Sequence, residues 1–410
     1  KTIEPLEATQ FVGYEILNCE STILFANENV VILNQTPFYA ESGGQIGDSG
    51  IVKGPSGEAT IRDTTVFPSG QYLHHIEKQE GELLVGAKVT AQVDHTRRQN
   101  IQRHHTGTHL LHWALREILG NHVKQQGSWV GPERLRFDFS HFESLTETQI
   151  EKIEDLVNQE IFSNSSVEVI ETEMDEAKKL GAIAFFGDKY GENVRVLKAG
   201  HESIELCGGT HVSHLSEIGP LKIVSEGSIG SNIRRVEAIA GGGAIQLIRD
   251  QQTVLEQIAN TLGVPKSNLA EGLTKKIREV EDLTEEVQIL RKSFIMNKAQ
   301  ELVQTAKDGI IAQRIEGISR TDLKELALQL RNNKNIETVI LGTALENGGA
   351  AIAAAVSEKS SHKASELIAE AAKLIKGGGG KGKDFAMAGG KDSKALDEAI
   401  AIARKAAVRD

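Results

Sequence analysis

Residues 104–122 read HHTGTHLLHWALREILGNH and carry five of the thirteen histidines in this 410-residue chain. Apolar residues recur at helical spacing through this stretch, so residues 97–119 are predicted to form a helix. His105 and His109 are four residues apart and share a face of that helix, and His112 lies near the same face. His104 has no histidine four residues further along the helix, so it has no partner for such a pair. A lone pair of this kind is more typical of hydrogen-bonded imidazoles in a packed helix than of a metal site.

A second segment of the sequence makes a metal site the more favoured interpretation. LCGGTHVSH, residues 206–214, contains the only cysteine of the middle region. Cys207 is followed by His211 four residues on, and the two glycines between them allow a tight turn. Three imidazoles and one thiolate suit tetrahedral zinc. The alternative is a buried, reduced cysteine beside unrelated histidines. The predicted zinc ligands are His105, His109, Cys207 and His211.

The composition is that of a globular chain, with 39% apolar and 25% charged residues and a net charge of −11. This charge argues against capture of nucleic acid by the whole surface, although a local basic patch remains compatible with it. Two cysteines, Cys19 and Cys207, make no disulfide framework and fit a reducing compartment such as the cytoplasm. No run of transmembrane length and no signal peptide is seen. Neither DNA nor a membrane is an expected partner.

The pattern along the chain predicts an α+β protein of several domains. Short β-branched runs separated by Gly, Pro and Asn make residues 1–92 β-rich, as a barrel or a sandwich. Residues 93–240 mix helices and strands and form the α+β core with the zinc site. Residues 241–305 form a long helical, coiled-coil-like connector, and residues 306–410 a small α/β domain.

The connector carries a nearly heptad apolar seam, which is typical of a long helix or a helical hairpin. It would act as a spacer or a dimer contact, and in either case we expect the seam to be buried. The seam residues are Leu273, Ile277, Val280, Leu283, Val287, Leu290 and Phe294.

Several motifs, in one order, resemble the alanyl-tRNA synthetase family. HTGTHLLHWAL, HVKQQGS, RLRFDFSH, LCGGTHV and IGSNIRRVEA are similar to its editing domain. FYAESGGQIGDSG resembles its glycine-rich editing motif, and KGGGGKGKDFAMAGGKD its C-terminal DHH-associated domain. The resemblance runs from near residue 10 to the end of the chain. It therefore covers every predicted domain.

This resemblance implies hydrolysis of tRNA(Ala) wrongly charged with serine or glycine. Such a site is needed because an alanine pocket cannot exclude glycine by size and rejects one added hydroxyl only weakly. The expected partner is tRNA(Ala). The chain opens on Lys1 inside a strand-like pattern, so we expect a C-terminal half without the aminoacylation domain, which alone would use ATP and Mg²⁺. The alternatives are a stand-alone trans-editing deacylase and a non-catalytic, zinc-stabilised module for tRNA binding and dimerisation.

The resemblance also implies roles for single residues near the zinc site. Gln125, in HVKQQGS, would place water or the ester through its amide. Thr36 corresponds to a threonine that reads the serine hydroxyl, or it is simply a strand-end residue bonded to backbone. Gly43 and Gly44 would shape the loop over the site, or form ordinary turns. Four protein ligands make a closed zinc site, so either one ligand yields, or the coordination expands, or the metal positions the substrate.

The remaining candidates concern RNA and the surroundings of zinc. Arg234 and Arg235 would contact phosphate or ribose, or form structural salt bridges. Asp138 would orient a zinc-bound imidazole, or form an ion pair. Arg97, Arg98 and Arg103 form a local basic cluster beside the predicted metal helix. In the glycine-rich C-terminal loop, the candidates for tRNA phosphate are Lys381 and Lys383.

Overall fold

The computed structural model describes residues 6–183, 193–346 and 348–408. The chain divides into two compact units, Lys1–Glu256 and Gln257–Asp410. Both units combine helices with strands, so the prediction of an α+β chain with several domains is confirmed. Among the described residues, no helix has both the length and the apolar character that a membrane crossing demands.

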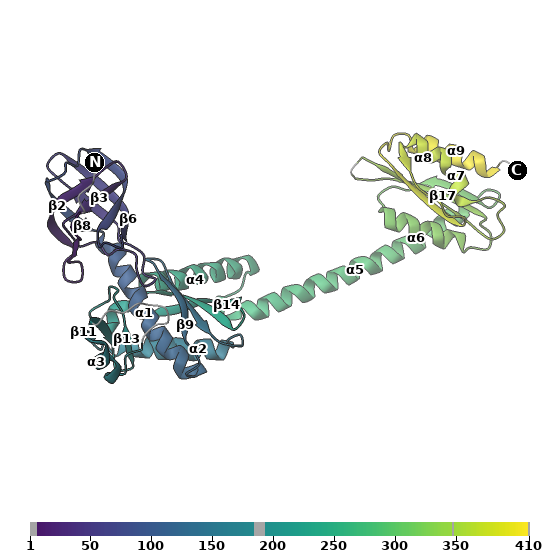
Figure 1. Cartoon of the computed structure of the whole chain (residues 1–410). Coiled ribbons are helices and arrows are strands. Elements are labelled where there is room, and N and C mark those ends of the chain that lie inside the picture. The colour runs from purple at the N-terminus through teal and green to yellow at the C-terminus, as the bar shows by residue number, and fades with distance from the viewer. Residues whose placement is uncertain (1–5, 184–192, 347, 409–410) are drawn as a thin grey trace. The chain divides into compact units, whose positions relative to one another are not determined.

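The first unit begins with a closed barrel of strand order β2-β3-β7-β6-β5-β8 (Figure 1). Its residues alternate between the two faces, as along β8, where Val89, Ala91 and Val93 are buried and the residues between them are exposed. A short parallel pair, β1 (Gln10–Phe11) with β4 (Gln35–Thr36), accompanies the barrel. Of the two predicted architectures, the barrel is the one observed. Its strands are β2 (Asn18–Ala26), β3 (Val30–Leu33), β5 (Gly50–Lys53), β6 (Gly57–Val66), β7 (Tyr72–Gly81) and β8 (Lys88–Val93).

Helix α1 (His95–Leu119) follows β8 after one residue, Asp94, whose carboxylate caps the helix by accepting from the Arg97 amide. It packs with α2 (Glu147–Phe162) against an antiparallel sheet of order β14-β15-β10-β9. The shared core includes the fully buried Leu111, Phe137 and Val236. The strands are β9 (Gln125–Val130), β10 (Leu135–Ser140), β14 (Leu221–Gly230) and β15 (Ile233–Ala240).

A second, three-stranded sheet positions the cysteine. It has the order β11-β12-β13, all antiparallel, and its last strand ends one residue before Cys207. The short helix η1 (Leu215–Ile218) follows the cysteine-containing loop, and α4 (Gly242–Leu262) follows β15. The remaining elements are β11 (Val167–Glu173), α3 (Met174–Lys179), β12 (Asn193–Ala199) and β13 (Ser203–Leu206).

The second unit contains η2 (Lys266–Asn268), the long helix α5 (Leu269–Gln304) and a mixed sheet of order β16-β17-β18-β20-β19. Helices cover both faces of this sheet (Figure 1). Strand β18 is apolar on both faces, which explains this cover on two sides. Its odd-numbered alanines pack with α5 and α6, and its even-numbered residues pack with α7 to α9. The elements are β16 (Ile310–Arg314), α6 (Arg320–Arg331), β17 (Thr338–Ala344), β18 (Ala350–Val356), α7 (Ala364–Leu367), α8 (Ala369–Leu374), β19 (Gly377–Gly378), β20 (Phe385–Gly390) and α9 (Leu396–Val408).

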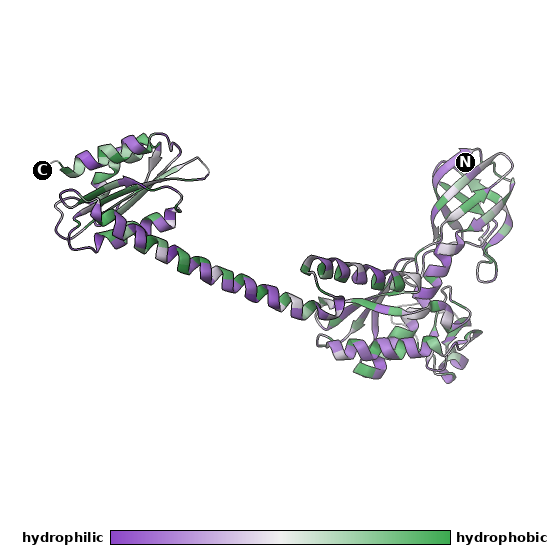
Figure 2. Cartoon of the chain, turned by 180° about the vertical axis from the view of Figure 1, so that it is seen from behind, coloured by the Kyte–Doolittle hydropathy of each residue, from purple (hydrophilic) through white to green (hydrophobic). Residues whose placement is uncertain are grey.

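The apolar seam of α5 is not buried within the single chain. Its seven side chains are between 46% (Val287) and 63% (Val280) exposed, and hydrophobic and hydrophilic residues alternate along the helix (Figure 2). The expectation of a buried seam therefore fails for the single chain. Periodicity predicts which residues share a face of a helix, but it does not say whether the same chain supplies the partner.

Candidate metal centre and its surroundings

Four side chains from two segments meet in one cluster. His105 and His109 lie one turn apart on α1, and Cys207 and His211 lie on the loop after β13. Their candidate ligand atoms all lie within 4.8 Å of one another. The Cys207 Sγ is 3.4 Å from His105 Nε2 and 3.2 Å from His211 Nε2. The structure thus brings together the residues that the two spacings singled out.

Glycine is required in the loop that carries Cys207. A Cβ atom on Gly209 would lie 2.0 Å from Cε1 of His105, so only glycine allows the loop to approach the helix this closely. Arg195 on β12 holds the loop by donating to the carbonyls of Cys207 (3.0 Å) and Gly209 (2.9 Å). The Tyr14 hydroxyl donates to the carbonyl of Gly208 at 2.6 Å.

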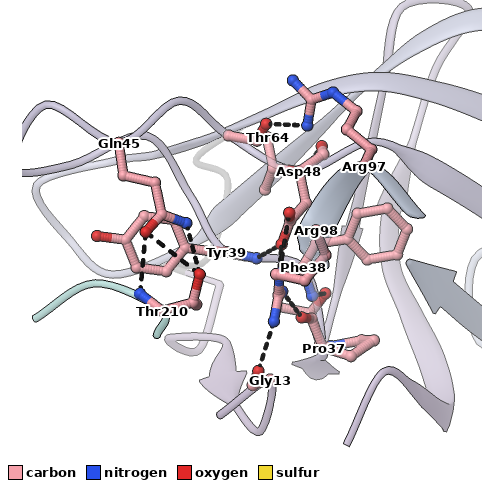
Figure 3. Close-up of polar contacts among 12 residues, drawn as sticks. Gly13, Pro37, Phe38, Tyr39, Gln45, Asp48, Thr64, Arg97, Arg98 and Thr210 are labelled. Carbon is pink, nitrogen blue, oxygen red and sulfur yellow. Dashed lines mark hydrogen bonds and ion pairs between the residues drawn. The ribbon is translucent and has the colours of Figure 1, made fainter. Parts of the chain in front are cut away.

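Gln45 sets the orientation of His105. The backbone N–H of Thr210 donates to Gln45 Oε1 (2.9 Å), which identifies that atom as the amide oxygen. His105 Nδ1 lies 2.8 Å from the same oxygen and must therefore carry the proton that it donates. Because Nδ1 is protonated, the Nε2 lone pair of His105 faces Cys207 (Figure 3 shows Gln45 and Thr210).

Glu205 and Thr106 orient the other two candidate ligand imidazoles, those of His109 and His211. His109 Nδ1 donates to the Glu205 carboxylate, which also accepts from His112 Nδ1 at 2.6 Å. The Thr106 hydroxyl donates to the carbonyl of Gln102 at 2.9 Å, so its oxygen accepts from His211 Nδ1 at 3.2 Å. Each imidazole is thus held with Nδ1 outward and Nε2 toward the thiolate. This is the arrangement that metal-binding histidines need.

Charge reinforces this arrangement. Burial would raise the pKa of Cys207, but the three adjacent imidazoles hold it well below its ordinary value. Burial would also raise the pKa of Glu205, yet the His109 charge and the two imidazole hydrogen bonds lower it to about 2. Burial would lower the pKa of His109, but Glu205 and Cys207 raise it to about 10. A cation that binds here therefore displaces a proton from His109 and meets a thiolate.

His104 is a structural residue. Its Nδ1 donates to the carbonyl of Gly131 at 2.9 Å, and its Nε2 accepts from the amide of Ala240 at 3.0 Å. Burial lowers the pKa of His104 to about 4, so it is neutral at physiological pH. Of the five histidines in the opening stretch, two are candidate ligands, and His112 shares the Glu205 carboxylate with one of them, His109.

A buried ion pair ties the barrel to the metal helix (Figure 3). Arg98 lies two turns before His105 on α1 and binds both oxygens of Asp48, and each of these side chains is 1% exposed. The same guanidinium donates to the carbonyls of Gly13 (2.7 Å) and Pro37 (2.9 Å). The expectation that Arg98 belongs to a basic surface cluster is therefore wrong, because its charge is internal.

The glycine-rich loop docks against β9. Gly43 and Gly44 have φ angles of +60° and +84°, which favour glycine, and a Cβ on Gly44 would lie 2.3 Å from the Ser128 hydroxyl. The Gly44 carbonyl accepts from the Val130 amide at 2.8 Å. This docking inserts the next residue, Gln45, into the metal centre, where it is fully buried.

The two residues predicted to act in catalysis lie in different surroundings. Gln125 is half-buried at the start of β9, and its side chain makes one hydrogen bond to a described residue, from Nε2 to the Ser128 hydroxyl at a long 3.5 Å. Thr36 is fully buried, and its oxygen accepts from the Phe38 amide at 3.1 Å. His74 Nδ1 faces the carbonyl of Val31, so His74 Nε2 is unprotonated and accepts the Thr36 hydroxyl proton at 2.7 Å. The Thr36 oxygen can therefore meet a ligand only as an acceptor.

The basic and acidic candidates outside the metal cluster form ion pairs. Arg234 binds both oxygens of Glu226, and Arg235 binds both oxygens of Asp138. The carboxylate that contacts the imidazoles is Glu205, not Asp138. Two further candidates, Lys381 and Lys383, are exposed just before β20.

Sequence reasoning missed Gln45 and Glu205. Glu205 lies two residues before Cys207 in the strand ESIEL, so alternation places it on the buried face with Ser203. An acidic residue at a buried strand position beside a ligand is a usable signal. The sequence signal for Gln45 is weaker, because the sequence of its loop does not indicate which side chain points into the protein.

Comparison with known proteins identifies three family models along the chain. Residues 6–97 match the model described as "tRNA synthetases class II (A)". Residues 194–237, which include Cys207 and His211, match "Threonyl and Alanyl tRNA synthetase second additional domain". Residues 307–409 match the "DHHA1 domain".

Curated relatives extend the match over nearly the whole chain. It is 37% identical to the alanine–tRNA ligase of Geobacillus kaustophilus over 414 residues, covering 96% of this chain and 47% of the relative. The alanine–tRNA ligases of Halalkalibacterium halodurans and Pseudomonas fluorescens are 40% and 39% identical, again over 96% of this chain and 47% of each relative. The chain spans about half the length of the curated relatives it matches. Among solved structures, the C-Ala domain of Aquifex aeolicus alanyl-tRNA synthetase is 25% identical, with a TM-score of 0.23, over 24% of this chain and 91% of that domain.

Proposed function

Because this chain is a relative of the alanine–tRNA ligases and matches their C-terminal half, we propose that it hydrolyses the ester of tRNA(Ala) mischarged with serine or glycine. The ligase activity in the relatives' names belongs to proteins about twice as long. For this chain we therefore propose only the hydrolytic, editing activity. ATP and Mg²⁺ would serve the ligation reaction and are not part of this proposal.

One observation carries the proposal: three imidazoles and a thiolate converge, and each imidazole has its Nδ1 proton engaged. Such a donor set fits zinc, and His105, His109, Cys207 and His211 would hold it. Zinc, when bound, supplies Lewis acidity toward an ester carbonyl or a water molecule. Gln45, Glu205 and Thr106 keep the imidazoles in the tautomer that can bind it.

Gln125 and Thr36 would discriminate and position the substrate. We assign to the Gln125 amide the placing of water or of the ester, because its one side-chain hydrogen bond to a described residue is long and weak. Thr36 would accept a hydrogen bond from the serine hydroxyl, since its own proton goes to His74. Alanine offers no such donor, so this contact favours the seryl ester over the alanyl ester. Glycine has no donor either, so hydrolysis of the glycyl ester would depend on a site shape that penalises the methyl group of alanine.

The partner in this proposal is tRNA(Ala), held partly by the second unit. Lys381 and Lys383 carry exposed charge beside backbone that glycine keeps accessible. Arg235, although paired with Asp138, is 31% exposed and remains able to contact phosphate. The exposed seam of α5 supports a homodimer in which two copies bury it. Both cysteines are free, in keeping with a cytoplasmic protein.

The experiment compares Gln125→Ala with Gln126→Ala, a matched variant of the exposed neighbouring residue. Deacylation of seryl-tRNA(Ala) should fall at least about tenfold for the first and stay near the unaltered rate for the second. Binding of tRNA should be equal for both. If the unaltered, zinc-loaded chain binds tRNA but shows no hydrolysis, the closed four-ligand set marks a non-catalytic tRNA-binding module instead.

A further inference from the structure

Three of the four tyrosines of the chain gather around Phe11. The Phe11 ring lies 4.9 Å from Tyr14 and 6.0 Å from Tyr39, both edge to face, and is stacked with Tyr72 at 5.8 Å. Aromatic residues make up only 4% of the sequence, so a group of four is a concentrated feature. We call these four residues the aromatic cluster.

Tyr14 of the aromatic cluster contacts the loop that carries two of the candidate ligands. The Tyr14 hydroxyl donates to the carbonyl of Gly208, the residue after Cys207, at 2.6 Å. The cluster therefore lies beside the site where an ester would react.

Tyr14 is the ring that faces solvent. It is 46% exposed, whereas Tyr39 is 6% exposed. The Arg195 guanidinium lies 4.2 Å from the Tyr14 ring centroid and is itself anchored on the carbonyls of Cys207 and Gly209. The ring is thus held in place by Arg195, while nearly half of the residue's surface remains exposed.

We propose that the aromatic cluster, with Tyr14 as its open ring, stacks on the adenine base of the terminal nucleoside of tRNA while the ester lies at the metal centre. The ligand's identity rests on the proposed function. Base and ester belong to one nucleoside, and the Tyr14 hydroxyl bonds the residue next to a metal ligand, so the ring lies within the reach of that nucleoside. Stacking on an aromatic side chain holds a base without reading its hydrogen-bonding edge.

The physical advantage is orientation. An ester that is attached only at the metal centre can rotate about the sugar, and holding the base as well restricts this rotation. A tyrosine that only supported the loop would need its hydroxyl but no open ring face. Its burial would then resemble that of Tyr39, whose hydroxyl donates to the carbonyl of Ser42 at 3.2 Å.

The test measures binding of two non-hydrolysable probes to the zinc-loaded chain by calorimetry. The first is 3′-serylamino-3′-deoxyadenosine, and the second is the same amide on a ribose without a base. The unaltered chain should bind the first about 5- to 150-fold more tightly, the range that corresponds to the roughly 1–3 kcal/mol of one stacked base. Tyr14→Leu should bring this ratio close to one, and Tyr14→Phe should keep it. Phe142→Leu removes another exposed aromatic, 71% exposed, and should change nothing.

Equal binding of both probes by the unaltered chain would overturn the proposal. So would a Tyr14→Leu variant that weakens both probes by the same factor, because Tyr14 would then support the loop only. A measurement without any variant covers the case in which Tyr14→Leu does not fold: 2-aminopurine in place of adenine should lose fluorescence on binding, and unchanged fluorescence counts against stacking. Hydrolysis of seryl-tRNA is measured separately, so its absence would contradict the proposed function and not the base-binding site.

Discussion

Replacing Glu205 with glutamine should weaken zinc binding without changing any ligand. The Glu205 carboxylate accepts from both His109 Nδ1 and His112 Nδ1 and is 2% exposed. A glutamine has one acceptor oxygen, so its amide N–H would face the Nδ1 proton of one imidazole. If that imidazole is His109, its proton must move to Nε2, the atom that a metal needs.

The size of the effect follows from the hydrogen bond that the substitution removes. A hydrogen bond to a charged group is worth about 1.5–3 kcal/mol, and loss of a carboxylate behind a metal-binding histidine usually costs about 10- to 100-fold in affinity. The two ranges agree, because each tenfold change in affinity corresponds to about 1.4 kcal/mol, and 10- to 100-fold is therefore about 1.4–2.8 kcal/mol. We expect the zinc Kd to rise by about 10- to 100-fold at neutral pH.

The assay is a competition titration against a chromophoric zinc chelator. Glu202→Gln is the matched control, because it makes the same substitution three residues away at an exposed position. Thermal unfolding of both metal-free variants shows whether the fold is retained. Equal zinc affinity of Glu205→Gln and Glu202→Gln would refute the reasoning that Glu205 fixes the tautomer of His109.

Other outcomes follow from the barrel and from α5. Arg98→Met leaves Asp48 charged and buried without its partner, so urea denaturation should show a loss of about 3–5 kcal/mol, and a loss below about 1 kcal/mol would contradict the internal ion pair. Burial lowers the pKa of His74 from 6.5 to about 4. As the pH falls from 6.5 toward 4, the unfolded chain takes up a proton on this residue before the folded chain does. The contribution of His74 to stability, complete above pH 6.5, should therefore fall by about 3 kcal/mol, and His74→Gln should reduce the slope to which His104 also contributes. Leu283→Glu should convert a dimer to a monomer in light scattering, and a monomeric unaltered chain would argue against the dimer.

Local pattern predicts most of the fold. Periodicity indicates the helix at residues 97–119, and the structure has it at His95–Leu119. The β-rich start is compatible with a barrel or a sandwich, because closure depends on pairings such as β2 with β8 that local sequence does not encode. The exposure of the α5 seam depends on a partner surface that the helix's own periodicity does not specify.

The candidate metal site is predictable only in part, because residues distant in the sequence orient its ligands. The ligands stand at spacings that a helix and a tight turn bring together, so His109 and His211 can be singled out from the sequence. Their supports come from elsewhere in the chain: Gln45 lies 60 residues before His105, and Glu205 lies 96 residues after His109. Arg98 cannot be placed from the sequence, because an arginine on a helix gives no sign that a distant loop supplies Asp48.

The most direct measurement is deacylation of seryl-tRNA(Ala) and alanyl-tRNA(Ala) by this chain, with zinc bound and after its removal. We expect rapid loss of serine that depends on zinc, with the alanyl ester spared. Equal loss of both esters would contradict the role of Thr36 as the acceptor for the serine hydroxyl. No turnover by a folded, zinc-loaded chain that binds tRNA would contradict the hydrolytic function itself.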